Sequence, residues 1–198
     1  MFGLIVILIA LGYLLLSIAV VIGMRKHARN TGKNVRRWGW SAALVMWLIP
    51  FWDWLPTVAV HQYYCATEAG FWVYKTPEQW MKENREALNS LRWNDVPDYT
   101  NLPDGTRRAT LNERIIGDVS IHRLALTSTY LQREKFVDMQ SGEVMAQRIS
   151  VGSGYGNLGV SGRDWRALKF WLSLDPCIPE ADRFNNYFNQ IQQLGAKK

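Results

Sequence analysis

The N-terminal stretch constrains this chain more than any other part of it. Residues 2–24 carry no charged side chain and are almost wholly aliphatic. A helix of about 20 such residues crosses the hydrocarbon core of a bilayer, which is about 30 Å thick. A second apolar stretch, residues 38–60, follows after a short polar interval and is interrupted by two prolines and one aspartate. The sequence therefore predicts a transmembrane hairpin over residues 1–61.

The interval between the two stretches, residues 25–37, contains basic residues and no acidic residue. Short loops rich in Lys and Arg stay on the cytoplasmic side of a membrane. We therefore expect loop 25–37 in the cytoplasm, and both the N-terminus and the C-terminal domain on the opposite side. The residues that predict this topology are Arg25, Lys26, Arg29, Lys33, Arg36 and Arg37.

A cleaved signal peptide is the alternative interpretation of the first stretch. A signal peptide begins with a positively charged segment and ends at a small-residue cleavage site. Met1–Leu4 carries no charged side chain, and no A-x-A pattern ends the apolar run. The first stretch is therefore expected to be a retained anchor.

The net charge of +6 follows from the same topology. Loop 25–37 holds six of the 23 basic residues, and residues 62–198 hold 17 basic and 16 acidic ones. The domain after the hairpin is therefore nearly neutral, which disfavours nucleic acid as a partner. The basic loop itself is suited to anionic lipid headgroups, so the lipid bilayer is an expected partner.

The segment Val73–Trp80 (Val-Tyr-Lys-Thr-Pro-Glu-Gln-Trp) resembles stretches of bacterial inner-membrane proteins, including those of prophages and genomic islands. With this resemblance we expect the chain in the bacterial inner membrane, and the topology predicted from loop 25–37 then places the C-terminal domain in the periplasm. The resemblance implies no particular activity.

Two cysteines, Cys65 and Cys177, both follow the hairpin. An even number of cysteines outside the cytoplasm permits an intramolecular disulfide. Such a bridge closes a loop of over a hundred residues, for which the chain-entropy model gives about 4–5 kcal/mol of stabilisation. Two unpaired buried thiols are the alternative. We predict the Cys65–Cys177 disulfide.

Asp53 is the sole acidic residue of the predicted hairpin. If the second span ends near Pro50, Asp53 lies in the outer interface and meets water. If the span continues to Val60, Asp53 lies within the membrane, where a carboxylate usually marks an ion path or a partner charge. Nearby prolines weaken the helix and favour the interfacial placement.

Residues 62–198 predict one periplasmic α+β domain, an antiparallel sheet of about five strands with two helices. Thr76-Pro77-Glu78-Gln79 is a helix-start signal, and the first helix is expected to run to about Trp93. Residues 94–105 are expected to form a loop, and the β-rich segments after Thr106 an antiparallel meander. Asp182 is expected to cap a closing helix. The β-formers of Thr57–Tyr64 predict a strand, and residues 165–172 another.

A glycine-rich stretch, residues 152–162, is the most suggestive functional segment. It lacks the Gly-Lys-Ser/Thr signature of a phosphate-binding loop, and no clear helix pattern follows it. Because binding residues concentrate on loops, we expect it to contact a partner protein. The candidate binding residues are Tyr155, Asn157, Leu158 and Trp165.

Three classes of function remain open. The first is a membrane-anchored periplasmic module that binds other envelope or membrane proteins, as in envelope-complex accessory or entry-exclusion roles, with oligomers possible. The second is a subunit of a small channel or transporter that uses Asp53. The third is a periplasmic enzyme, for which Ser120 or Ser128 with His122 is conceivable although no nucleophile motif surrounds them. No residue pattern predicts a catalytic residue, a cofactor or a metal site; His61 and Cys65 are four residues apart but have no further ligand cluster nearby.

Overall fold

The computed structural model describes residues 2–155 and 169–197. The chain divides into two compact units. The helical unit contains the residues up to Val58 together with the described part of Gly154–Ser173. The sheet unit contains Ala59–Ser153 and the C-terminal residues from Leu174.

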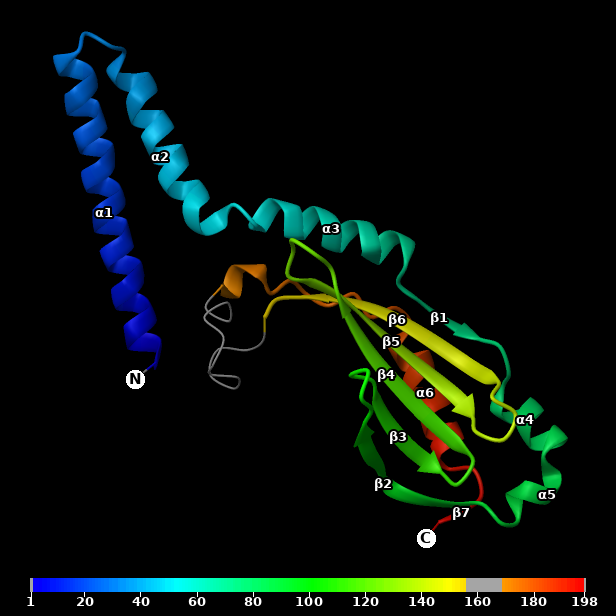
Figure 1. Cartoon of the computed structure of the whole chain (residues 1–198). Coiled ribbons are helices and arrows are strands. Elements are labelled where there is room, and N and C mark those ends of the chain that lie inside the picture. Colours follow the sequence, from blue (N-terminus) through cyan, green and yellow to red (C-terminus); the bar gives the residue numbers. More distant parts are fainter. Residues whose placement is uncertain (1, 156–168, 198) are drawn as a thin grey trace. The chain divides into compact units, whose positions relative to one another are not determined.

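Helix α1 (Phe2–Asn30) is the long apolar helix of the chain (Figure 1). Its segment Val6–Asn30 is long and apolar enough to cross a membrane. Helices α2 (Val35–Phe51) and α3 (Trp54–Thr67) reach that length only together, with a bend of 51° between them. The structure thus has one apolar N-terminal helix and, separately, an antiparallel sheet with helices. The second membrane crossing stays a prediction.

The basic residues predicted to lie in a loop are mostly helical. Helix α1 continues to Asn30 and α2 begins at Val35, so the connection is a short turn. The side chain of Asn34 accepts hydrogen bonds from the backbone N–H groups of Arg36 and Arg37, at 3.1 and 3.2 Å, and so begins α2. This N-terminal cap satisfies donors that have no partner within the helix. All six cations remain exposed around the turn.

A proline in α2 explains a hydrogen bond between α1 and α2. Pro50 lies inside α2 and has no N–H to donate to the carbonyl of Met46, four residues earlier. The hydroxyl of Tyr13 on α1 donates to that carbonyl instead. The hydrogen bond that proline removes from α2 is therefore replaced by one between the two helices.

The predicted strand at Thr57–Tyr64 is wrong, because this segment belongs to α3. Pro56 falls in the first turn of α3, where a backbone N–H has no helical partner anyway. The buried residues Asp53, Thr57 and His61 recur every four residues, which is helical spacing. Packing of this row outweighs the weak strand preference of β-branched side chains.

The sheet has seven strands in the order β1-β6-β5-β4-β3-β2-β7, not about five. All neighbouring pairs are antiparallel except β2 and β7, which are parallel. The strands are β1 (Gly70–Val73), β2 (Arg92–Asn101), β3 (Arg107–Asn112), β4 (Ile115–Arg123), β5 (Thr129–Asp138), β6 (Val144–Ser153) and β7 (Ala196–Lys197).

Strand β2 occupies most of the predicted loop at 94–105. Pro97 argued against a strand there, because proline cannot donate a ladder hydrogen bond. The pairing of β2 with β3 shifts register between Trp93 and Asp98, which forms an irregularity around the proline. Such bulges are where strands tolerate proline.

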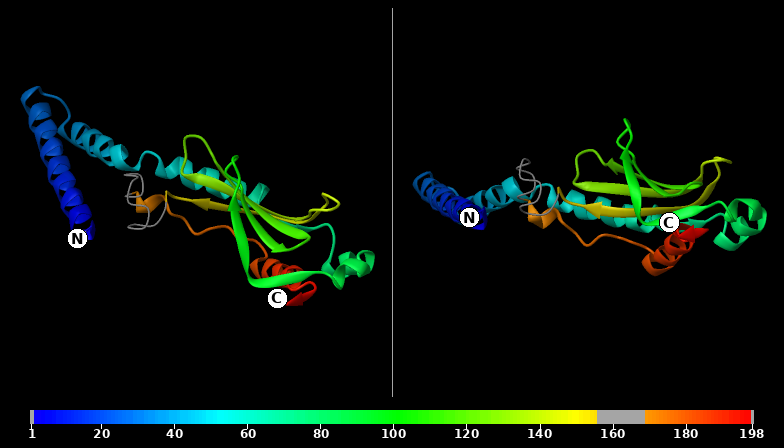
Figure 2. Two further views of the ribbon diagram at one scale, coloured as in Figure 1. Left: turned by 60° about the horizontal axis from the view of Figure 1, so that its bottom comes forward. Right: turned by 90° about the horizontal axis from the view of Figure 1, so that it is seen from below.

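Helix α6 (Ala181–Gln192) packs on one face of the sheet (Figure 2). The predicted closing helix is thus present, but the prediction that Asp182 caps it is wrong, because Glu180 is its N-cap and Asp182 lies in its first turn. Phe184 and Tyr187 contact Phe136 of β5 and Phe71 of β1, with ring centroids 5.5 to 5.8 Å apart. This aromatic cluster is the centre of the core.

The first helix of the sheet unit is shorter than predicted. The capping box is present: Thr76 accepts from the N–H of Gln79, whose side chain accepts from the N–H of Thr76. Helix α4 (Pro77–Glu83) then ends where the Asn84 side chain donates to the carbonyl of Trp80, and the short helix α5 (Arg85–Leu88) follows. Of the predicted strand at 165–172, the structure describes residues 169–172, which contain the 3₁₀ turn η2 (Phe170–Leu172).

Candidate functional sites

Asp53 lies between α2 and α3 in the helical unit, and 6% of it is exposed. Its Oδ2 forms an ion pair with Lys169, a residue that precedes η2. Among the described residues, no group bonds Oδ1 of Asp53, the hydroxyl of Thr57 or the indole N–H of Trp171. Sequence reasoning singled out Asp53 but missed Lys169, since no pattern links residues 116 positions apart. The structure thus pairs Asp53 with a cation through Oδ2, while Oδ1 has no partner within the described part of the chain.

Apolar residues adjoin this site in the chain: Phe51 lies two residues before Asp53, and Phe170 follows Lys169. An apolar groove of about 860 Å³ lies between α1, α2 and η2. Phe51 packs edge-on against Trp171, with ring centroids 5.0 Å apart. A charge in such surroundings costs free energy unless it is paired, so Lys169 and Asp53 stabilise each other's burial.

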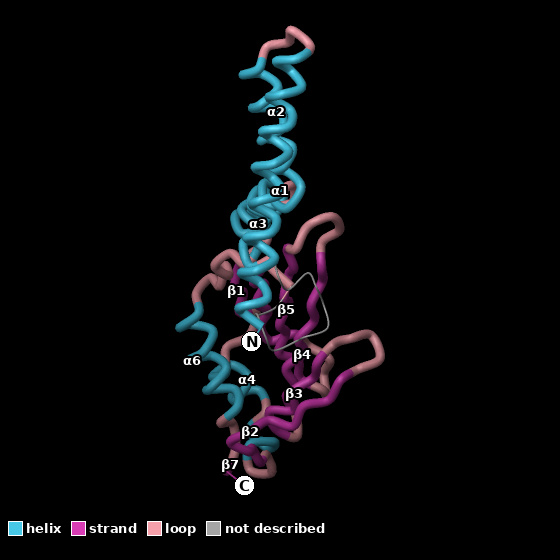
Figure 3. The backbone as a smooth tube through the Cα atoms, turned by 90° about the vertical axis from the view of Figure 1, so that its left-hand side faces the viewer, coloured by secondary structure: helices cyan, strands magenta, loops and turns pink. Residues whose placement is uncertain are grey.

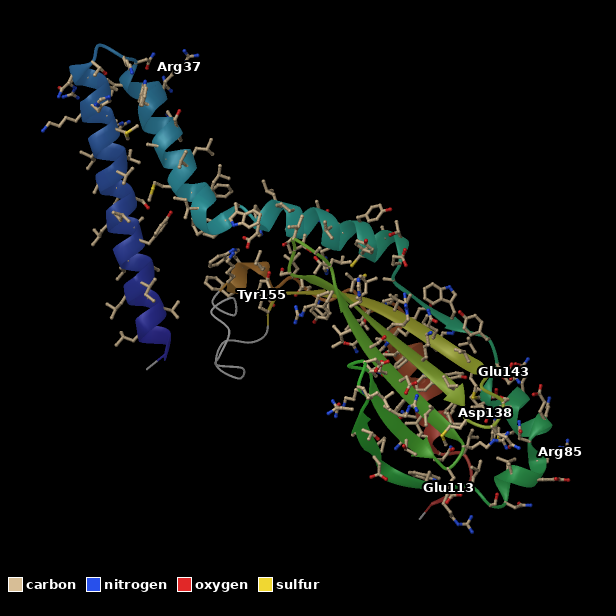
Figure 4. All side chains as sticks on the ribbon, viewed as in Figure 1. Arg37, Arg85, Glu113, Asp138, Glu143 and Tyr155 are labelled. Carbon is tan, nitrogen blue, oxygen red and sulfur yellow. The ribbon has the colours of Figure 1, made fainter. Side chains whose placement is uncertain are left out.

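Asp138 at the end of β5 is the second buried carboxylate, with 2% exposed (Figure 4). Trp80 donates to its Oδ2 at 2.9 Å, the backbone of Gln140 donates to Oδ1 at 2.9 Å, and Arg114 donates to both oxygens at 3.0 and 3.1 Å. Burial acts to raise the pKa of Asp138, but these hydrogen bonds outweigh it and hold the pKa below its ordinary value. A carboxylate with both oxygens bonded is suited to holding the sheet end in place.

Cys65 and Cys177 lie close together although 112 positions separate them. Both are free thiols, and Sγ of Cys177 is 3.9 Å from the carbonyl oxygen of Cys65. Burial, together with a hydrogen bond to Cys177, raises the pKa of the Cys65 thiol to about 12. The ring of His61 lies 3.9 Å from Sγ of Cys65. The structure brings the predicted pair together, and the disulfide itself stays a prediction.

The glycine-rich stretch is described only in part. Tyr155 is half-buried (Figure 4). Asn157, Leu158 and Trp165 lie outside the described residues. Partner binding through residues 152–162 therefore stays a prediction.

Sequence reasoning missed the connection between β4 and β5, which Figure 3 draws as a loop at the end of two long strands. Leu126 at this tip is 88% exposed and has a φ of +66°. Ile121 on β4 is also exposed. The available signal was the apolar run Leu124-Ala125-Leu126 in a position where turns are usually polar.

The groups considered for nucleophilic catalysis do not form a relay. His122 is exposed on β4, and Ser120 is two residues before it. The hydroxyl of Ser128 is buried and has no hydrogen-bond partner among the described residues. Ser128 therefore does not bond His122, as a serine nucleophile and its base require.

Metal ligands do not converge in residues 2–155 and 169–197, where no three His, Cys, Asp or Glu side chains form a group able to hold an ion. Comparison of the whole chain with protein-family models, curated proteins and solved structures finds no match in any of the three.

Proposed function

We propose that this chain is a membrane-anchored binding module of the bacterial inner membrane. In this proposal α1 and α2 form a transmembrane hairpin with its basic turn in the cytoplasm. The sheet unit then lies in the periplasm and binds another envelope protein. The observation that carries the binding role is the exposed, conformationally strained leucine at the β4–β5 tip.

Two features of the helical unit support the hairpin. The exposed cations gather at the turn between α1 and α2, as the positive-inside rule requires of a cytoplasmic turn. The carbonyl of Met46, which Pro50 leaves without a partner, accepts from Tyr13 on α1. Every backbone polar group in a bilayer core needs a partner within the protein, and this contact supplies one.

Leu126 supports protein binding because its placement is unfavourable in the free chain. A left-handed conformation costs a residue other than glycine about 1–2 kcal/mol. Leaving a leucine side chain in water forgoes about 1.5–3 kcal/mol of burial. Such strain at an exposed site is a feature of binding surfaces, where a partner covers the apolar side chain.

The test places a photo-crosslinking amino acid at position 126 of the full chain in its native membrane. A discrete adduct is expected at Leu126, and the captured protein is then purified for a direct binding measurement. Leu126→Asp should weaken that binding by at least about tenfold, which corresponds to about 1.4 kcal/mol. Met139, also an exposed apolar residue, is the matched control: Met139→Asp should leave binding unchanged.

Leu126→Gly separates binding from stability. Glycine adopts positive φ without strain, so this variant should be about 1 kcal/mol more stable than the native chain while binding more weakly. Unchanged binding in both Leu126 variants would show that the tip is not the binding surface.

A second candidate function is an ion or proton path, favoured by Oδ1 of Asp53, which has no hydrogen-bond partner in residues 2–155 and 169–197. A half-bonded carboxylate in an apolar region is typical of such paths. Reconstituted chain should then conduct protons or cations in a vesicle flux assay, and Asp53→Asn should abolish that flux. Vesicles that stay as tight as protein-free ones would exclude this candidate.

A further inference from the structure

In helix α3 most of the exposed side chains are apolar, whereas the polar residues Thr57 and His61 are buried. Around its axis one arc faces inward: Thr57 and His61 are buried, as is Asp53 just before the helix, and the half-buried residues are Val58, Val60, Tyr64 and Cys65. The opposite arc is exposed and contains mainly apolar side chains, which are Leu55, Pro56, Ala59, Tyr63 and Ala66, together with the polar residues Gln62 and Thr67. A helix on the surface of a water-soluble domain shows the opposite arrangement.

The large apolar side chains of the exposed arc are more than half exposed. Leu55 is 58% exposed and Tyr63 is 63% exposed, whereas Thr57 is fully buried and His61 is 7% exposed. Trp52, immediately before α3, is 56% exposed. The exposed arc therefore presents a nearly continuous apolar strip along the helix.

Charge is absent from this helix. Residues 54–67 contain no Asp, Glu, Lys or Arg, and the first charge after them is Glu68. Tryptophan and tyrosine, which have an apolar body and a polar tip, prefer the headgroup level of a bilayer. Trp52, Trp54 and Tyr63 are of this type and are exposed.

We infer that α3 lies in the headgroup region of a phospholipid bilayer, with its apolar arc on lipid and its polar arc on protein. This inference rests on the proposed membrane anchoring by α1 and α2. Helix α3 follows α2 after a break with a bend of 51°, so the chain turns away from the direction of α2 as it leaves it. A lipid surface is favoured as the occupant because the apolar strip is continuous with the end of the proposed span.

The experiment uses the full native chain in vesicles of phosphatidylcholine and phosphatidylglycerol that carry a photoactivatable phospholipid with its diazirine in the upper acyl chain. After irradiation, lipid adducts are located by mass spectrometry of peptides. Labelling is expected on α1, on α2 and at Leu55, Ala59 and Tyr63. Tyr99 on β2 is 53% exposed and is the matched control. Labelling at Tyr63 should exceed that at Tyr99 by about tenfold or more, the ratio given by a preference of about 1.4 kcal/mol.

The outcomes separate this inference from the proposed anchoring. If α1 is labelled but Tyr63 is labelled no more than Tyr99, the inference is overturned and the proposed anchoring stands. Unlabelled α1 means that the anchoring proposal fails as well. Adducts on Thr57 and His61 as strong as those on Leu55 and Tyr63 also overturn it, because α3 would then be surrounded by lipid and span the membrane.

A matched pair of variants adds an independent readout. Tyr63→Asp should lower lipid labelling at Leu55 and Ala59 several-fold, because it places a charge in the apolar arc. Tyr99→Asp should leave it unchanged. Near-ultraviolet circular dichroism of both variants checks that the fold is kept, and equal labelling of α3 in two folded variants would count against the inference.

Discussion

Among the residues that the structure describes, two carboxylates are buried, one in each compact unit, and their hydrogen bonding differs. Asp138 in the sheet unit has both oxygens bonded, by Trp80, Arg114 and a backbone N–H. Asp53 in the helical unit is nearly as buried but has one oxygen paired with Lys169 and one without a partner among the described residues. The two carboxylates are thus similarly buried, but both oxygens of Asp138 have partners, whereas only one oxygen of Asp53 has a partner among the described residues.

The difference between the two carboxylates lies in the hydrogen-bond donors around them. The sheet unit surrounds Asp138 with residues from β3–β4, β5 and α4, all of which have donors to offer. In the helical unit Asp53 is paired with Lys169, and among the described residues the hydroxyl of Thr57 and the indole N–H of Trp171 have no hydrogen-bond partner either. Unsatisfied buried groups cost about 1–3 kcal/mol each, so the hydrogen bonding of Asp138 favours stability where that of Asp53 does not.

The largest expected effect comes from the cysteines, at the far end of the polar arc of α3. A thiol–disulfide oxidant that takes up two electrons should convert the two thiols, with loss of both protons, into a Cys65–Cys177 disulfide. The oxidised chain should then be about 4–5 kcal/mol more stable than the reduced one in the chain-entropy model. Denaturant unfolding in detergent with and without reductant measures the difference. Two freely alkylated thiols in protein from an oxidising compartment would contradict the bridge.

Asp138→Asn should destabilise the sheet unit by about 3 kcal/mol, because it leaves the half-buried Arg114 without its buried counter-charge. Chemical unfolding of the full chain in detergent, followed by tryptophan fluorescence, gives the value. The control is Asp118→Asn, which breaks a more exposed pair with Arg108 and should cost less than about 1 kcal/mol. Equal losses of unfolding free energy in the two variants would mean that the full set of hydrogen bonds to Asp138 does not add to stability.

Asp53→Leu and Lys169→Met should each destabilise the helical unit by about 2 kcal/mol, since each removes one partner of the Asp53–Lys169 ion pair. The double variant should recover most of that loss, because apolar residues often replace a buried ion pair without cost. Thermal unfolding, monitored by the helical signal in circular dichroism, compares the two single variants with the double variant. Additive losses in the double variant would show that the two residues are not coupled.

The smallest effect is on acid stability. The folded-state pKa of Asp138 lies below its unfolded value of about 3.9, so its contribution is present above that pH and is lost as pH falls through the folded pKa. Unfolding measured from pH 5 to pH 2 should show this loss. Asp138→Asn should flatten that part of the profile, and a native profile equally flat would contradict the assignment.

Local signals in the sequence predicted much of this fold. The capping box at Thr76 and the amphipathic stripe of α6 depend on neighbouring residues, so they are visible without tertiary contacts. The strand at Thr57–Tyr64 and the loop at 94–105 were wrong for the opposite reason. Burial of one row made α3 a helix, and a bulge allowed Pro97 within β2.

By itself, the sequence determined an uncharged apolar helix at the N-terminus, a cluster of cations after it and an α+β domain with an antiparallel meander. Each depends on composition or on short-range periodicity. The tertiary structure alone decided that Asp53 meets Lys169, that Cys65 lies beside Cys177 and that α3 turns its apolar side outward. The physical reason is that pairs over 110 positions apart, and the choice of which helix face is buried, depend on how distant segments pack.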